Sequence, residues 1–192
     1  IWGVQFHPED LATAGDSISA RFFYFLVQKA ATYRHAKEIH RRILSLDTHT
    51  DTPLDFDVSY NIGTREKTQV CLPKMREGKL DGQYLACWVR QGLCDEENSL
   101  KAIDRVDELI RHIYRQVEMN GEQCAIARTP DDLSRLKTEG KKAFYIGIEN
   151  GYGIGKDLKN ITRFHDAGVT YITLCHTRNN DICDSSSDTT AR

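Results

Sequence analysis

The sequence predicts an α/β protein in which a parallel sheet is covered by helices. Four short apolar runs have the length of buried strands, and helical segments separate them; the runs are residues 43–49, 82–89, 143–149 and 169–175. Strands that alternate with helices are typical of parallel sheets, because each crossover between neighbouring strands needs a long connection. A doubly wound sheet and part of a (β/α)8 barrel both satisfy this order, and only the chemistry at the strand ends separates them.

The helices between these strands are indicated by apolar spacing and by residues typical of helix ends. Thr129 is suited to the N-cap position, and Pro130 follows it at the first helical position. Gly140 and Gly168 stand where the carboxyl-terminal caps of two helices are expected. The predicted helices span residues 98–120, 130–140 and 158–164.

The amino-terminal segment has a different pattern. Residues 16–31 predict a helix with one apolar face, and residues 32–42 are polar and basic, as in a linker or an exposed helix. We therefore predict two domains, residues 1–34 and residues 35–192. The chain begins without an initiator Met and ends in a loop-like string from Ser185, which indicates a segment of a longer protein.

Composition excludes several classes of protein. The 26 basic and 28 acidic residues give a net charge of −2 and are mixed along the chain, so no nucleic-acid partner is expected. The longest apolar runs, residues 22–27 and 84–89, have six residues each, whereas a bilayer span needs about 20. The six cysteines show no paired C-x2-C spacing and favour a reducing compartment. We expect a cytoplasmic protein, and no leader sequence is present to decide the location.

Titratable side chains follow three of the four predicted strands. His49 and Asp51 lie two residues apart, so they point to the same side of an extended segment and suit a divalent metal. The alternative is a plain turn before Pro53. Glu149 ends the third strand, where it can bridge two metal ions, act as a base or accept local backbone N–H groups. His176 follows the fourth strand, and a single His there is more often structural.

Three segments resemble the renal (membrane) dipeptidase family of zinc peptidases: LDTHTDTP, QVCLPKMREGKLDGQYLACWV and IGIENGYGIGKDLKNITRFHDAGVTYITLCHTRNNDICDSS. The resemblance implies a partial (β/α)8 TIM barrel with about the first four strands, a centre of two Zn²⁺ ions, and hydrolysis of dipeptides. By position, it implies that His49 and Asp51 bind the first zinc and that Glu149 bridges both ions. It also implies that His176 contacts the substrate near the scissile carbonyl.

The sequence departs from this family in several places. The family takes two further His ligands for the second zinc from later strands, but no His follows His176 in this chain. Tyr152 stands where the family often has His, and Asn150 replaces the first of two Gly, so the substrate side chains stay open. The resemblance also allows a homodimer when the protein is intact, and an exported location is the alternative to a cytoplasmic one.

Residues 2–9, WGVQFHPE, resemble the last catalytic motif of class I glutamine amidotransferases and γ-glutamyl hydrolases. In that motif a strand delivers His and Glu to a Cys nucleophile, and here His7 and Glu9 share one strand face. The alternative is an ordinary strand and turn. The sequence thus predicts a fusion of the end of an amidotransferase-like domain with the first half of a zinc dipeptidase barrel, inactive as this segment alone. The competing interpretations are a γ-glutamyl or glutamine hydrolase with an accessory barrel, and a non-catalytic truncated remnant.

Overall fold

The computed structural model describes residues 17–189, and the chain forms two compact units that divide between Ile43 and Leu44. The described part of the first unit is helix α2 (Ser17–Arg42). The helix predicted over residues 16–31 and the basic segment after it therefore form one continuous helix. Its last turn carries Arg41 and Arg42, whose positive charges suit the carboxyl-terminal end of a helix. The predicted boundary near residue 34 falls inside α2.

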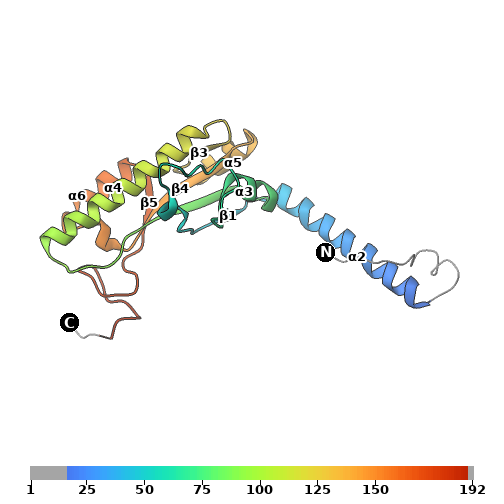
Figure 1. Ribbon diagram of the computed structural model, residues 1–192, viewed down its shortest axis with the longest axis horizontal. Coiled ribbons are helices and arrows are strands. Elements are labelled where there is room, and N and C mark those ends of the chain that lie inside the picture. The colour runs from blue at the N-terminus through green and yellow to red at the C-terminus, as the bar shows by residue number, and fades with distance from the viewer. Residues whose placement is uncertain (1–16, 190–192) are drawn as a thin grey trace. The chain divides into compact units, whose positions relative to one another are not determined.

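The second unit contains a five-stranded sheet in which all paired strands are parallel (Figure 1). The strands are β1 (Leu46–Asp47), β2 (Gly82–Trp88), β3 (Cys124–Ile126), β4 (Lys142–Glu149) and β5 (Val169–Ile172). On one side of β4, the whole length of β2 pairs with residues 143–149. On the other side, β4 pairs first with β3 and then with β5. Apart from the short β3, the strands lie side by side in chain order. That order is expected of a barrel, whereas a doubly wound sheet reverses its order part of the way along.

Helices cover both faces of this sheet. Helix α4 (Glu96–Met119) packs Val106, Leu109 and Ile113 into the main core, beside Phe144 and Ile146 of β4. Helix α5 (Pro130–Thr138) packs Leu133 and Leu136 against Ala143 and Tyr145, the alternate residues of the same strand. Because successive side chains of a strand point to opposite faces, α4 and α5 lie on opposite sides of the sheet. Each fully buried Leu, Ile or Phe contributes about 1.5–3 kcal/mol to stability.

The helix ends agree with the predicted capping residues. The Thr129 side chain accepts a hydrogen bond from the backbone N–H of Asp132, whose carboxylate accepts one from the backbone N–H of Thr129. This reciprocal pair is a capping box, and Pro130 follows it as predicted. Gly140 and Gly168 have positive φ angles of 76° and 100°, as expected just beyond helix ends.

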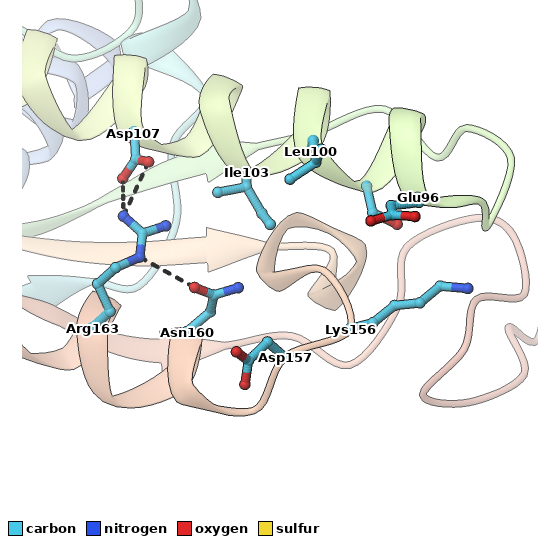
Figure 2. A pocket seen from close by; sticks show the side chains of 9 residues that line it. Glu96, Leu100, Ile103, Asp107, Lys156, Asp157, Asn160 and Arg163 are labelled. Atoms are coloured by element: carbon cyan, nitrogen blue, oxygen red, sulfur yellow. Dashed lines mark hydrogen bonds and ion pairs between the residues drawn. The ribbon is translucent and has the colours of Figure 1, made fainter.

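Helix α6 (Lys159–Asp166) lies beside α4 on the main-core side of the sheet. Phe164 is fully buried in that core, and Arg163 donates two hydrogen bonds from Nη1 to the Asp107 carboxylate of α4, at 2.8 and 3.0 Å (Figure 2). A pocket of ≈ 480 Å³ is lined by both helices and by the segment before α6.

Some elements differ from the sequence prediction. The first strand is two residues long instead of seven, and β3 and helix α3 (Leu72–Gly78) were not predicted. A three-residue strand is too short to show periodicity, and α3 buries only Leu72 and Met75. The fourth predicted strand stops at Ile172, since the Leu174 carbonyl accepts a hydrogen bond from the Asn180 side chain instead of a neighbouring strand.

This topology places the carboxyl ends of β1, β2, β4 and β5 at one rim of the sheet. Short 3-10 helices follow two of these ends, η1 (Thr52–Asp55) after β1 and η2 (Gly151–Ile154) after β4. Within residues 17–189, no helix is long and apolar enough to cross a bilayer.

Candidate metal centre

The loop after β1 is held by its own side chains and by β2. The Asp47 carboxylate accepts a hydrogen bond from the backbone N–H of His49 at 3.1 Å, a local turn typical of Asp. The Thr50 carbonyl accepts one from the Ala86 N–H at 3.0 Å, which ties the loop to the neighbouring strand. Asp51 then stands at the N-cap of η1. These contacts fix the backbone on both sides of His49.

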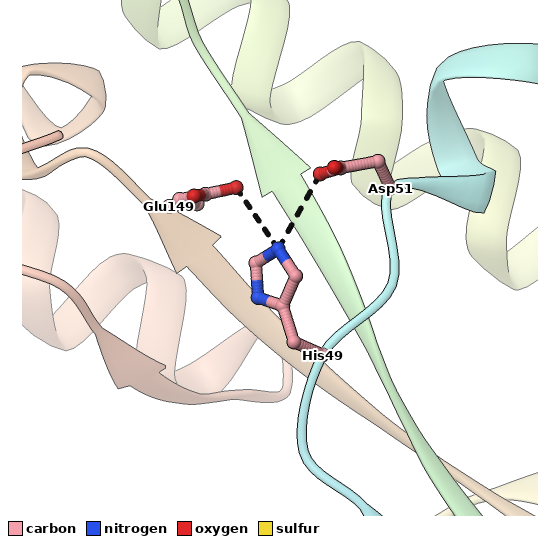
Figure 3. Close-up of side chains that lie close together, drawn as sticks. All are labelled: His49, Asp51 and Glu149. Carbon is pink, nitrogen blue, oxygen red and sulfur yellow. Dashed lines mark ion pairs between the residues drawn. The ribbon is translucent and has the colours of Figure 1, made fainter. Parts of the chain in front are cut away.

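Three predicted ligands meet at the rim. His49 Nε2 lies 3.2 Å from Glu149 Oε2 and 3.5 Å from Asp51 Oδ1 (Figure 3). One ligand atom from each of the three residues lies within 4.8 Å of the others. An imidazole nitrogen with two carboxylates is a donor set that binds zinc in proteins. The residues present therefore fit a divalent metal ion.

The two carboxylates at this site differ in exposure. The Glu149 side chain is only 15% exposed, whereas that of Asp51 is 58% exposed. Burial raises the pKa of Glu149 above its ordinary value, and the charge of Asp51 raises it further, while His49 and His176 act in the opposite direction. Bringing these carboxylates together thus has an electrostatic cost, which a bound cation would offset.

His176 lies on the other side of the same carboxylate. Its Nε2 is 3.4 Å from Glu149 Oε1, whereas His49 faces Oε2. The indole N–H of Trp88 donates to His176 Nδ1 at 3.5 Å, and the two rings are nearly perpendicular, at 80°. The His176 carbonyl accepts a hydrogen bond of 2.7 Å from the Ser185 hydroxyl, which holds the segment after β5 in place. The structure therefore brings together His49, Asp51, Glu149 and His176.

Two aromatic neighbours of this group were not singled out from the sequence. Trp88 ends β2 in register with Glu149. Its place at the carboxyl end of a parallel strand was therefore a signal that it lies at the same rim. The Tyr171 hydroxyl lies 3.3 Å from His49 Nδ1. Gly147 was the available signal for Tyr171, because a glycine inside a strand often marks the close approach of another group. Burial is the main cause that raises the pKa of Tyr171 to about 12.

An open pocket of ≈ 600 Å³ adjoins the centre. His49 and Asp51 line it on one side, and the segment from Lys67 to Val70 lines it on the other. This volume is within the usual range for small-molecule sites, about 300–1,000 Å³. His7 and Glu9, the other two candidate catalytic residues, lie outside the described residues.

A partial parallel barrel with a His-Asp-Glu group at its carboxyl rim has the arrangement of a barrel metalloenzyme. A sequence profile of the membrane dipeptidase family, peptidase family M19, matches residues 33–192. The chain belongs to this family, and the predicted family resemblance is confirmed. Membership implies a metal, for which the His-Asp-Glu group is the candidate.

Individual relatives agree with this assignment. The dipeptidase ataJ of Aspergillus terreus is 28% identical over 164 residues, which cover 80% of this chain and 40% of the relative. The crystal structure of the probable dipeptidase PvdM from Pseudomonas aeruginosa matches with a TM-score of 0.72 and 30% identity, over 80% of this chain and 40% of that one.

A second solved structure shares the fold at lower identity. It is a metallopeptidase from Rhodobacter sphaeroides liganded with a phosphinate mimic of the dipeptide L-Ala-D-Ala. It matches with a TM-score of 0.62 and 19% identity, over 72% of this chain and 47% of that one. The chain spans about 40% of the length of curated relatives such as ataJ. None of the relatives described here is an amidotransferase or a γ-glutamyl hydrolase, so the resemblance of residues 2–9 stays a prediction.

Proposed function

We propose that the complete protein is a zinc-dependent dipeptidase and that His49, Asp51 and Glu149 hold its metal. The observation that carries this proposal is the convergence of their three ligand atoms within 4.8 Å at the rim of a barrel of this family. Zinc is favoured over magnesium or calcium because an imidazole nitrogen is among the donors, whereas those two ions prefer oxygen alone. When bound, zinc lowers the pKa of a coordinated water to about 7 and polarises a carbonyl.

Glu149 has the central place in this proposal. It is the least exposed of the three ligands, and its two carboxylate oxygens face different histidines. A carboxylate with both oxygens directed into the site can serve two metal ions, as the family resemblance implies. The second ion would need ligands besides the three described here.

His176 is proposed to contact the substrate rather than the metal. Its Nε2 atom points into the same site from the segment after β5 and faces Glu149 Oε1, whereas His49 faces Oε2. An N–H group at that position can donate to the oxygen of the scissile carbonyl as negative charge develops on it. Such a donor stabilises the transition state more than the substrate, because the oxygen gains charge during attack.

A dipeptide is the proposed substrate. The family name and the dipeptide mimic bound by the Rhodobacter sphaeroides relative both support this class, and the pocket beside His49 is large enough for it. Residues 1–34 are proposed not to belong to the dipeptidase domain, whose family match begins at residue 33, although helix α2 continues to Arg42. No observation on residues 17–189 favours γ-glutamyl hydrolysis, so we propose no second function.

The test uses the full-length gene product, with metal content measured by mass spectrometry and hydrolysis measured on L-Ala-L-Ala and L-Ala-D-Ala. We expect bound zinc, loss of hydrolysis on chelation, and recovery when zinc is restored. Glu149→Gln should release zinc and lower kcat/KM by about 100-fold or more, as the loss of a central stabilising group does. Glu122→Gln, at an exposed position before β3, is the matched control and should leave both unchanged. Normal zinc content and rate in Glu149→Gln would refute the assignment.

A further inference from the structure

The two histidines beside Glu149 have different partners at their second ring nitrogen. His49 Nδ1 lies 3.3 Å from the Tyr171 hydroxyl, and His176 Nδ1 accepts the Trp88 indole N–H at 3.5 Å. Both Nε2 atoms face the same carboxylate, at 3.2 and 3.4 Å. The two imidazoles therefore differ in what their Nδ1 atoms contact, and His49 Nε2 also lies 3.5 Å from Asp51 Oδ1.

The contact at Nδ1 decides which ring nitrogen of each histidine can carry the proton. An indole N–H can only donate a hydrogen bond, so the Nδ1 atom that receives it has to be unprotonated. A neutral His176 then carries its proton on Nε2, which lies 3.4 Å from Glu149 Oε1. A phenol hydroxyl, by contrast, can donate or accept. His49 can therefore carry its proton on either nitrogen beside Tyr171.

Metal binding requires an unprotonated nitrogen, since the lone pair forms the bond to the ion. His49 can release Nε2 for this purpose by carrying its proton on Nδ1, where the Tyr171 oxygen accepts it. His176 cannot do the same while Trp88 donates to its Nδ1. The choice of aromatic partner thus decides which histidine is able to act as a ligand.

We propose that Trp88 and Tyr171 are positioning residues that give the two histidines different roles. Trp88 holds His176 as an Nε2–H donor directed into the site, and Tyr171 allows His49 to bind the metal through Nε2. This inference rests on the proposed metallopeptidase function, since it concerns the same centre.

The fold fixes both aromatic side chains. Trp88 is the last residue of β2 and lies in register with Glu149 on the adjacent strand. The ring of Tyr171 lies over Gly147, where an added Cβ would come within 2.2 Å of a ring carbon, and it also packs on Tyr84 with ring centroids 5.1 Å apart. Only a glycine at position 147 leaves room for the ring, so the strand supports the Tyr171 contact.

Nitrogen NMR of the full-length gene product, labelled with ¹⁵N-histidine, tests the proposal because it reports which ring nitrogen carries the proton. Spectra are recorded without metal and after addition of Zn²⁺, at a pH where the rings are neutral, and the two signals are assigned by their loss in His49→Gln and His176→Gln. We expect His176 to be protonated on Nε2 in both states. We expect the proton of His49 to be on Nδ1 once Zn²⁺ is bound.

Two variants separate the roles. In zinc-bound Trp88→Phe, an Nδ1–H form of His176 should appear. Outright removal of a transition-state donor lowers kcat by about 100-fold or more, and the fall in kcat of this variant should be smaller. Its KM and zinc content should be unchanged. In Tyr171→Phe, His176 should keep its wild-type signals, while zinc affinity falls about 10- to 100-fold, as for other partners of ligating histidines.

The outcomes distinguish this proposal from the proposed function. A wild-type His176 protonated on Nδ1 would overturn the proposal without any variant, and so would a zinc-bound Trp88→Phe protein in which His176 stays protonated on Nε2 alone. Absence of zinc binding and of dipeptide hydrolysis in the wild type would instead refute the proposed function. The proton position of His176 is readable in the zinc-free protein in either case.

Discussion

The side chains of Asn150 and Asn180 form a buried hydrogen bond next to the candidate metal ligand Glu149, with Asn180 Nδ2 donating to Asn150 Oδ1 at 3.1 Å. Both residues are fully buried. Asn150 also donates to the Val89 carbonyl at 3.1 Å, and Asn180 donates to the Leu174 carbonyl at 2.8 Å. The pair therefore connects the segments that follow β2, β4 and β5, immediately beside Glu149.

Asn150 makes these bonds at a conformational cost. Its φ angle of 85° lies in the left-handed region that favours glycine, and glycine is the residue that the family resemblance leads one to expect there. The hydrogen bonds of the Asn side chain have to offset the strain of this backbone conformation.

We predict that Asn150→Ala destabilises the protein more than Asn150→Gly does. Both variants lose the buried hydrogen bonds, at about 1–3 kcal/mol for each polar partner left unsatisfied. The alanine variant also retains the strained φ angle, at a further cost of about 1 kcal/mol or more, which glycine relieves. Denaturant unfolding of the two variants measures the difference. Equal stabilities would show that the positive φ angle costs nothing at this position.

The sequence predicted which titratable residues lie at the rim of the sheet better than it predicted the hydrogen bonds between the loops around them. Glu149 was singled out because a residue at the end of a parallel strand lies at the rim whatever the details of the loop that follows. His49 and His176 were singled out by the same argument, although they lie two and four residues beyond the ends of β1 and β5. The role of Asn180 could not be predicted in this way. Its bonds to Asn150 and Leu174 depend on how a loop folds back over the sheet, and no periodic pattern encodes such a contact.

In the secondary structure, a long helix was predicted accurately and a short strand was not. Helix α4 was predicted within two residues at each end, because its 24 residues carry a repeating apolar face. The strand predicted over residues 43–49 pairs only at Leu46 and Asp47. Apolar content suggested a longer strand there, but Ile43 continues helical hydrogen bonding to Ile39. The bounds of a short strand depend more on the elements packed next to it than on the propensities of its own residues.

A second prediction concerns Gly147. Gly147→Ala would place a Cβ atom within 2.2 Å of the Tyr171 ring, so the ring has to move away from His49. We expect a loss of about 1–3 kcal/mol in the free energy of unfolding, as for other overpacked sites, together with weaker zinc binding. Calorimetric titration with Zn²⁺ and denaturant unfolding measure the two effects.

Gly78→Ala provides the matched control for this substitution. Gly78 ends helix α3, and an added Cβ there meets no atom within 4 Å. The control should leave zinc binding unchanged and unfold at the same denaturant concentration or a slightly higher one, since alanine favours helix. Equal behaviour of Gly147→Ala and Gly78→Ala would contradict the packing argument.

Asp81 is the subject of a third prediction. Its carboxylate is almost fully buried and accepts hydrogen bonds from the backbone N–H of Ser45 at 3.0 Å and from Lys137 Nζ at 2.7 Å. It thus joins the start of β1 to α5. Asp81→Ala should destabilise the protein by about 3 kcal/mol, because it leaves a partly buried ammonium group without this partner. The double variant Asp81→Ala with Lys137→Met should recover part of the loss, and a further loss in thermal unfolding would contradict the pairing.

The pH dependence of stability should depend in part on Asp132. Hydrogen bonds from the Arg135 guanidinium, and then from the backbone N–H groups of Arg128 and Thr129, hold the pKa of Asp132 well below its ordinary value. A carboxyl group whose pKa is lower in the folded state adds stability above its unfolded pKa of about 3.9, and this contribution is lost as the pH falls toward the folded value. Protonation removes the charge that these donors stabilise.

We therefore predict that Asp132→Asn lowers stability near pH 7 by about 0.5–2 kcal/mol, because the amide keeps an acceptor oxygen but loses the charge that strengthens these hydrogen bonds. The difference from the wild type should shrink as the pH is lowered below about 4, because the carboxyl group of the unfolded wild type then binds a proton while the folded state still holds Asp132 ionised. Asp131→Asn, at the exposed neighbour in the same helical turn, should have a smaller effect at pH 7. Thermal unfolding of the three proteins between neutral and acid pH measures this. A difference between Asp132→Asn and wild type that grows toward acid pH would have the wrong sign and would exclude Asp132 as the group responsible.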